Sequence, residues 1–174
     1  MSSTAPQSPS PARGGGQGGG STPRVIAVGD LTLDDVVMPD GTTHMASIGG
    51  DCLYAALGAR LWEPSVGIVT RRGDDFPGDA WTGLQKLGIC LDGVVDIPGP
   101  TVRNWIIYEA DGRRHWVYRT PPGRATEVAV RPEDIPESWL SVLPAPVVHV
   151  AAIPIDAAER IVDSVRRLAP DATV

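Results

Sequence analysis

The chain has 174 residues, 42% of them hydrophobic, which suffices for one domain with a sizeable apolar core. Its net charge of -6 and pI near 4.9 argue against extensive electrostatic binding to nucleic acid or to an anionic membrane. They favour a small-molecule partner. The two cysteines, Cys52 and Cys90, lack the spacing of a disulfide framework or zinc site, and neither a membrane span nor a secretory signal is found, so we expect a cytoplasmic protein.

Residues 1–23 differ in composition from the rest of the chain. They consist almost entirely of Ser, Pro, Gly, Thr, Ala and Gln. Such a segment cannot bury enough apolar surface to offset the entropy lost on ordering. We therefore predict a disordered tail at 1–23 and a folded domain at 24–174.

The first predicted strand ends in polar residues. An apolar run at 25–28 is closed by Gly29 and Asp30, a pattern typical of a buried parallel strand whose carboxyl end opens on a site. Residues 34–46 then contain a Pro-Asp-Gly turn at 39–41. That turn indicates a small hairpin or excursion before the next element.

Residues 48–62 read IGGDCLYAALGARLW and predict a helix that begins after two glycines. With no side chains at Gly49 and Gly50, the first free N–H groups of the helix can approach a ligand closely. Leucines 53, 57 and 61 recur at helical spacing and predict a face that packs on a sheet. The alternative, a glycine turn before an ordinary core helix, is the simpler interpretation of this segment taken alone.

Strand and helix patterns alternate after this segment. A strand is predicted at 65–70, a helix at 81–87 that ends at Gly88, and a further strand at 89–97. Between the first two, Asp74 and Asp75 are interpreted as caps of the coming helix. The alternation indicates an α/β domain.

A hairpin is predicted at 101–120, where two strand-like runs flank Asp111-Gly112. A two-residue turn there would place Trp105 opposite Tyr118 and Ile107 opposite Trp116 on one apolar face. The other face would carry Asn104, Tyr108, His115 and Arg119. Such a mixed face suits a sugar or nucleoside; a solvated sheet face is the alternative.

The last predicted elements are a helical connector at 132–143, a buried strand at 146–153 and an amphipathic helix at 156–168 with Asp156 as its N-cap. The residues expected to face inward are Ala158, Ile161, Val162, Val165 and Leu168. Residues 171–174 read as the opening of another strand. The sequence therefore looks truncated relative to a complete α/β architecture.

Four segments, VIAVGDLTLDDVV, GGDCLYAALGARLW, VGIVTRRGDDFPG and LQKLGICLDGVV, in this order resemble the N-terminal half of the ribokinase-like (PfkB) carbohydrate kinases. The resemblance covers 24–174. It implies part of a ribokinase-like three-layer α/β sandwich with a small β lid, whose strands lie near 35–47 and 101–120. It also implies a kinase that uses ATP and Mg²⁺ to phosphorylate a hydroxymethyl group of a sugar or nucleoside, and a possible homodimer through the lid.

The resemblance assigns the substrate site. Asp34 falls where the family has a carboxylate that accepts hydrogen bonds from substrate hydroxyls, and Thr32 where a second polar contact lies. Gly49 and Gly50 match a diglycine at the lid hinge. The predicted substrate-binding residues are Thr32, Asp34, Gly49, Gly50, Asp51, Tyr54 and Asn104. Without the resemblance, Asp34 is a turn or capping carboxylate.

Two features depart from the family pattern. Tyr54 stands where many of these kinases have an asparagine that contacts the sugar, so the usual pentose or hexose specificity is not carried over. The C-terminal motif D-T-x-G-A-G-D, which supplies the family's catalytic carboxylate, anion hole and most of its nucleotide site, does not occur here. Phosphoryl transfer depends on such positioned groups. We therefore expect no metal site, little ATP or Mg²⁺ binding and no kinase activity from these residues alone.

Three functions are compatible with these patterns. The first is the substrate-binding part of an ATP-dependent sugar or nucleoside kinase. The second is a non-catalytic sugar- or nucleoside-binding module derived from such a kinase. The third is a nucleotide-binding oxidoreductase domain, which the lack of a G-x-G-x-x-G pattern after Gly29 disfavours.

Overall fold

The computed structural model describes residues 22–174 and contains two four-stranded sheets. The predicted disordered tail, apart from residues 22 and 23, lies outside the described residues. One sheet is parallel, with the strand order β5-β4-β1-β8, and forms the body of the domain. Its strands are β1 (Val25–Val28), β4 (Val66–Gly73), β5 (Cys90–Ile97) and β8 (Val147–Val150).

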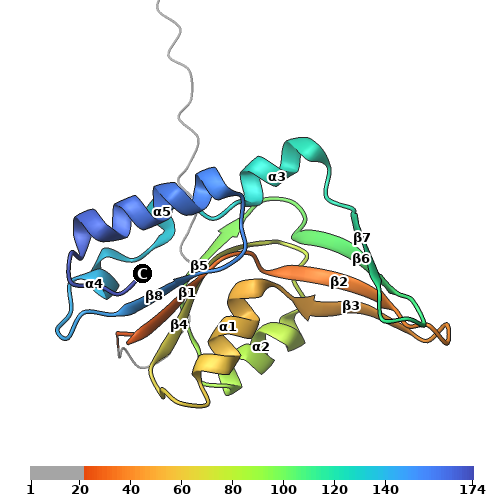
Figure 1. The fold of residues 1–174 in the computed structure, drawn as a ribbon, viewed down its shortest axis with the longest axis horizontal. Helices are drawn as coiled ribbons and strands as arrows, with labels where there is room; N and C mark the ends of the chain where they lie inside the picture. The colour runs from red at the N-terminus through yellow and green to blue at the C-terminus, as the bar shows by residue number, and fades with distance from the viewer. Residues whose placement is uncertain (1–21) are drawn as a thin grey trace, which may run out of the picture.

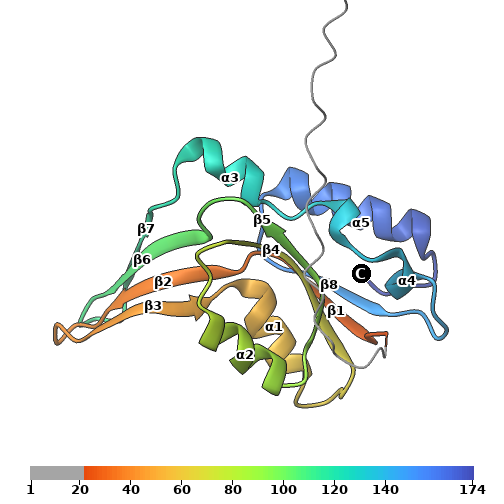
Figure 2. The ribbon, with the colours of Figure 1, turned by 180° about the vertical axis from the view of Figure 1, so that it is seen from behind.

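Helices cover both faces of the parallel sheet (Figures 1 and 2). One face carries α1 (Asp51–Ala59) and α2 (Gly78–Lys86); the other carries α5 (Ile155–Leu168), the 3-10 turn η1 (Pro132–Asp134) and α4 (Glu137–Leu140). Successive side chains of a strand point to opposite faces, so Ile26 and Val28 pack in one core with Ile161. Ala27 packs in the other with α1. The predicted three-layer α/β class is confirmed.

The second sheet projects from the body, at the right of Figure 1. Its order is β3-β2-β6-β7, and it includes residues of both predicted lid ranges. β2 pairs antiparallel with β3 and parallel with β6, and β6 pairs antiparallel with β7. The strands are β2 (Thr32–Val37), β3 (Thr43–Gly49), β6 (Val102–Tyr108) and β7 (Arg114–Tyr118). The short helix α3 (Pro122–Val128), which the sequence patterns did not predict, follows β7.

The predicted register of the β6–β7 hairpin is wrong by one residue. Asn104 pairs with Tyr118, and Ile106 pairs with Trp116. The loop has three residues, because the Glu109 N–H donates to the Arg113 carbonyl at 2.8 Å and Gly112 takes the left-handed conformation with φ +85°. A one-residue shift exchanges the two faces of a strand. Trp116 and Tyr118 therefore share a face with Asn104 and Tyr108, whereas His115 and Arg119 lie on the opposite face.

The capping roles predicted for three aspartates are also wrong. Helix α2 begins after Pro77 with no side-chain cap. Asp74 instead accepts a hydrogen bond from the Gly99 N–H at 3.0 Å, and Asp75 accepts one from the Thr101 N–H at 2.7 Å, so both hold the β5–β6 connection in place. The N-cap position of α5 is Pro154, and Asp156 lies in the first turn, where it pairs with Arg160.

Two predicted inward leucines are exposed, Leu61 at 79% and Leu168 at 47%. Helix α1 ends at Ala59, so Leu61 lies beyond its packed face. Near the last residue, Thr173 forms an isolated parallel bridge with Val147. None of the helices formed by residues 22–174 combines the length and the apolar character needed to span a membrane.

Candidate functional site

A cavity of about 330 Å³ lies where the two sheets meet. Its walls come from the carboxyl end of β1, the first turn of α1 and all four strands of the second sheet. Six of the predicted site residues line it, namely Thr32, Asp34, Gly50, Asp51, Tyr54 and Asn104. The structure thus brings these residues together, and Gly49 lies directly behind the Asp34 carboxylate.

Asp34 is the carboxylate of the cavity that protein hydrogen bonds fix in place. Its side chain is 6% exposed. Thr32 Oγ1 donates to Asp34 Oδ2 at 3.0 Å, and Asn104 Nδ2 donates to Asp34 Oδ1 at 2.9 Å. Each carboxylate oxygen can accept a second hydrogen bond, so Asp34 keeps capacity for ligand hydroxyls. Its partners are side chains of β2 and β6, so it is not a helix cap.

Asn104 carries an unused acceptor at the same place. The side chain is fully buried, and its Oδ1 atom has no hydrogen-bond partner among the described residues. A buried acceptor left unpaired costs about 1–3 kcal/mol. Because Oδ1 is itself buried, Asn104 contributes to the site through the hydrogen bond from its Nδ2 to Asp34.

The two glycines are required by close contacts. A Cβ atom at Gly49 would lie 2.0 Å from Asp34 Oδ2 and 2.6 Å from Thr32 Oγ1. Gly50, the N-cap residue of α1, has φ +112°, and a Cβ there would lie 2.2 Å from the Asp30 carbonyl oxygen. Only glycine fits at either position. The diglycine therefore sets the position of Asp34 as well as the start of the helix.

The cavity has an acidic lining. Asp30, Asp34 and Asp51 line it, and among its described lining residues Arg114 is the single basic one. Burial, and after it the neighbouring Asp51 carboxylate, raises the pKa of Asp30 to about 6. No protein donor pairs with the Asp30 carboxylate in the described part of the chain. The site therefore offers acceptors and negative charge.

The raised pKa of Asp30 predicts a pH-dependent stability. Because the folded-state value lies above the unfolded value of 3.8, this group's contribution to the free energy of unfolding is lost as the pH rises from about 4 through about 6. The free energy of unfolding of Asp30→Asn, taken relative to that of wild type, should therefore be larger at pH 7.5 than at pH 4 by on the order of 2 kcal/mol. Urea unfolding at the two pH values measures the gain. The exposed Asp79→Asn variant should show none, and an equal Asp30→Asn effect at both pH values would contradict the assignment.

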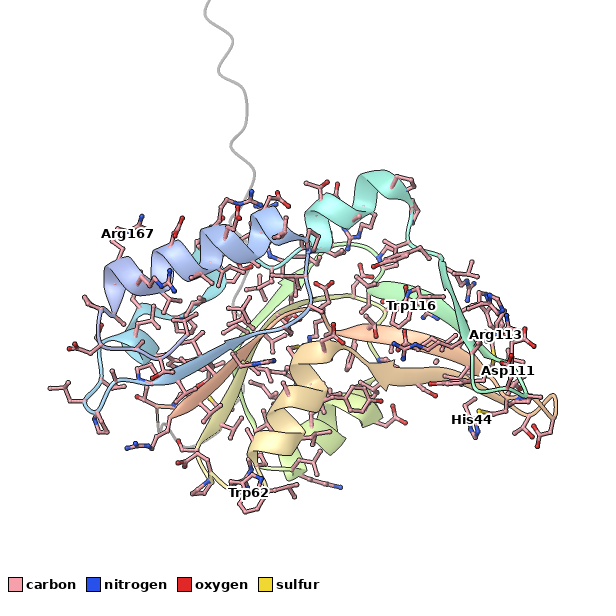
Figure 3. All side chains as sticks on the ribbon, in the orientation of Figure 1. His44, Trp62, Asp111, Arg113, Trp116 and Arg167 are labelled. Atoms are coloured by element: carbon pink, nitrogen blue, oxygen red, sulfur yellow. The ribbon has the colours of Figure 1, made fainter. Side chains whose placement is uncertain are left out.

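Sequence reasoning missed Asp30, Trp116 and Tyr118 as parts of this site. The predicted two-residue loop would have put the two aromatic side chains on the face of the hairpin opposite the cavity. The signal that points to the correct register is Gly112 as the third residue of an Ala-Asp-Gly loop, because three-residue hairpin loops place glycine at that position. Figure 3 shows Trp116 on the second sheet, far from the other labelled tryptophan, Trp62.

Comparison with known proteins supports the predicted resemblance. No family model matches the sequence. The chain is 33% identical over 132 residues to the cytidine kinase of Thermococcus kodakarensis, an alignment that covers 75% of this chain and 44% of that protein. The chain thus spans less than half the length of this relative.

Solved structures show the same fold. The ribokinase of Giardia lamblia matches with a TM-score of 0.66 and 20% identity, over 87% of this chain and 49% of that one. A putative ribokinase II from E. coli in complex with ATP and Mg²⁺ matches with a TM-score of 0.64 and 15% identity, over 85% of this chain and 49% of that one. The predicted ribokinase-like fold is confirmed.

The solved E. coli structure holds ATP and Mg²⁺. Within residues 22–174, no group of three or more His, Cys, Asp or Glu side chains lies close enough together to hold a metal ion. The D-T-x-G-A-G-D motif is absent from the sequence.

Proposed function

We propose, from the ribokinase-like fold and the similarity to a cytidine kinase, that residues 24–174 are the N-terminal, substrate-binding part of an ATP-dependent carbohydrate or nucleoside kinase. The ligand is a sugar or nucleoside with a hydroxymethyl group. In this proposal the cavity between the two sheets binds and orients the ligand. The phosphoryl-transfer chemistry requires groups that this sequence does not contain.

The observation that carries the proposal is the buried Asp34 carboxylate at the cavity wall. Thr32 and Asn104 each use one hydrogen bond to hold it, and the bare backbone of Gly49 gives it room. A carboxylate fixed in this way can accept two ligand hydroxyls without further reorganisation. Vicinal hydroxyls of a sugar ring have the matching geometry for such a pair of bonds.

Aromatic side chains support a nucleoside as the ligand. Trp116 and Tyr118 extend the cavity lining along β7, and Tyr54 lines it from α1. Their rings are partly exposed, Trp116 at 44% and Tyr118 at 70%, and so are available to a planar base or to the apolar face of a sugar. The similarity to a cytidine kinase favours the nucleoside.

A second candidate function is a non-catalytic sugar- or nucleoside-binding module. The absence of the D-T-x-G-A-G-D motif favours it. Both functions use the same cavity, so both predict that residues 24–174 bind a ligand without ATP, and they differ in whether that ligand is then phosphorylated with the help of further groups. A cytoplasmic location and a homodimer through the second sheet belong to the same proposal. For the dimer, the supporting observation is Val117, 46% exposed on the face of β7 opposite Trp116.

Calorimetric titration of the 174-residue chain with ribose, fructose, cytidine and adenosine tests the proposal. We expect at least one of them to bind with one site per chain and with an affinity that ATP and Mg²⁺ do not change. A nicotinamide dinucleotide serves as the control for the oxidoreductase alternative and should not bind. A folded chain that binds none of the four ligands would refute the proposed function.

A further inference from the structure

We propose that Asp35 and Arg119 are positioning residues, which hold the aromatic wall of the cavity in place from the opposite face of the second sheet. The aromatic wall consists of Trp116 and Tyr118 on β7. The inference rests on the proposed function and adds two residues that do not line the cavity. Their ion pair determines how firmly the cavity holds the base of a nucleoside.

Strand β7 needs support beyond its backbone hydrogen bonds. It is the outermost strand of the second sheet and pairs with β6, and all five of its residues are exposed. A strand that lies at an edge and buries none of its residues opens locally at a low cost in free energy. Trp116 and Tyr118 therefore form a fixed wall only if a further contact restrains β7.

Asp35 is the buried end of such a contact. Its side chain is 3% exposed, and its Oδ1 atom accepts a hydrogen bond from the Ala46 N–H at 2.8 Å. That bond crosses a β-bulge, where the β2–β3 register shifts between Asp34 and Val36 and Ala46 takes a φ of +52°. One oxygen of Asp35 is thus fixed to β3, which leaves Oδ2 for a partner on the other side.

Arg119, the residue that follows β7, is that partner, because its Nη1 donates to Asp35 Oδ2. The side chain crosses β6, which lies between β7 and β2, a span of about 10 Å at the usual strand spacing. Its Cζ atom lies 5.3 Å from the centre of the Trp105 ring, on the residue of β6 that pairs with Asp35. With one partner buried, the ion pair is screened less than an exposed pair.

The ion pair connects two walls of the cavity. Arg119 directly follows Tyr118, and Asp35 directly follows Asp34, so each member of the pair adjoins a side chain that lines the cavity. The pair therefore fixes the distance between the Asp34 carboxylate and the aromatic wall. In the proposed function a nucleoside spans this distance, with ribose hydroxyls at Asp34 and its base at the aromatic wall. Free ribose needs Asp34 alone.

Calorimetric titration of the 174-residue chain with cytidine and with ribose tests the inference. Arg119→Met and Asp35→Asn should each weaken cytidine binding about three- to tenfold, which corresponds to the loss of one aromatic contact, and should leave ribose binding unchanged. Because the two residues act as a pair, the double variant should bind cytidine no more weakly than either single variant. Arg113→Met, which removes an exposed pair with Asp111 at the hairpin tip, should bind both ligands as wild type does.

A second measurement does not depend on a ligand. Hydrogen exchange of the β7 amides should become about fivefold faster or more in Asp35→Asn and in Arg119→Met. Exchange in the parallel sheet should keep its wild-type rate in both variants, because the ion pair lies wholly in the second sheet. Arg113→Met should leave both rates unchanged.

The outcomes separate the two proposals. Unchanged exchange of β7 in both variants would overturn the inference, whether or not a ligand binds. Equal losses of affinity for cytidine and ribose would also overturn it, since they indicate a general structural role, and so would effects that multiply in the double variant. If β7 exchanges faster in the variants but neither ligand binds the wild-type chain, the proposed function fails, while the restraint of β7 by the ion pair stands.

Discussion

Replacing Gly49 with alanine should lower the ligand affinity of the cavity about 100-fold, the largest effect we expect from one methyl group. The new Cβ would lie 2.0 Å from Asp34 Oδ2 and 2.6 Å from Thr32 Oγ1, so the carboxylate must leave its position. Its two hydrogen bonds, from Thr32 and Asn104, would be strained or lost together with those to the ligand. Such losses amount to about 1.5–3 kcal/mol for each charged hydrogen bond. Calorimetric titration measures the change.

The matched control is Gly58→Ala in the adjoining helix, where an added Cβ meets no atom within 4 Å. Alanine is the better helix former, so this variant should be slightly more stable and should bind the ligand as wild type does. Overpacking at Gly49 should also cost about 1–3 kcal/mol of unfolding free energy. Normal affinity in a folded Gly49→Ala variant would show that Asp34 does not depend on the glycine.

Replacing Arg71 with methionine should lower the free energy of unfolding by about 3–5 kcal/mol. The Arg71 and Asp134 side chains are 9% and 5% exposed, and two hydrogen bonds, at 2.7 Å and 2.8 Å, join β4 to η1. Asp134 also accepts the Arg131 N–H at 2.8 Å. Removing the guanidinium leaves a buried carboxylate without its counter-charge, which is the costly case. Urea unfolding at pH 7 measures it.

An exposed ion pair provides the comparison. Arg160 and Asp156 pair at 3.0 Å on α5, with side chains 62% and 69% exposed. Arg160→Met should change stability by less than about 0.5 kcal/mol, because exposed pairs of this kind contribute little. If the two variants lost similar amounts, the buried pair would not stabilise the domain in the way described.

The strands of the body could be predicted because their own residues determine them. The apolar runs of β1 and β4 are buried on both faces of a parallel sheet, and such strands show as short continuous hydrophobic stretches. Gly50 likewise marks the start of α1, where its φ of +112° disfavours any other residue. In these places the local pattern and the tertiary structure agree.

The predictions that failed depend on partners distant in sequence. Asp74 and Asp75 were assigned to the next helix because it is near, yet their hydrogen bonds go to residues 99 and 101. The register of β6 and β7 depends on the length of the loop between them, and both two-residue and three-residue hairpin loops commonly contain glycine. A difference of one residue in the length of this loop determines which aromatic side chains face the cavity. The Ala-Asp-Gly sequence at residues 110–112 fits the three-residue loop, but it also contains the Asp-Gly pair typical of a two-residue loop.

The site was predicted from the family resemblance rather than from the residues alone. Taken alone, Asp34 suited a turn or cap better than a ligand contact. What the structure adds is the reason for each neighbour, since Thr32 and Asn104 hold the carboxylate and Gly49 gives it space. The pairing of Asn104 with Asp34 spans two strands that lie side by side in the parallel register.

The central claim is that Asp34 binds ligand hydroxyls, and Asp34→Asn tests it most directly. The change keeps the size of the side chain and removes its charge, so the folded chain should persist. Affinity for whichever of ribose, fructose, cytidine or adenosine binds the wild type should fall about 10- to 100-fold. Asp111→Asn, at the exposed hairpin tip, should bind as wild type does. Equal affinity of the Asp34→Asn and wild-type chains in the same titration would contradict the account.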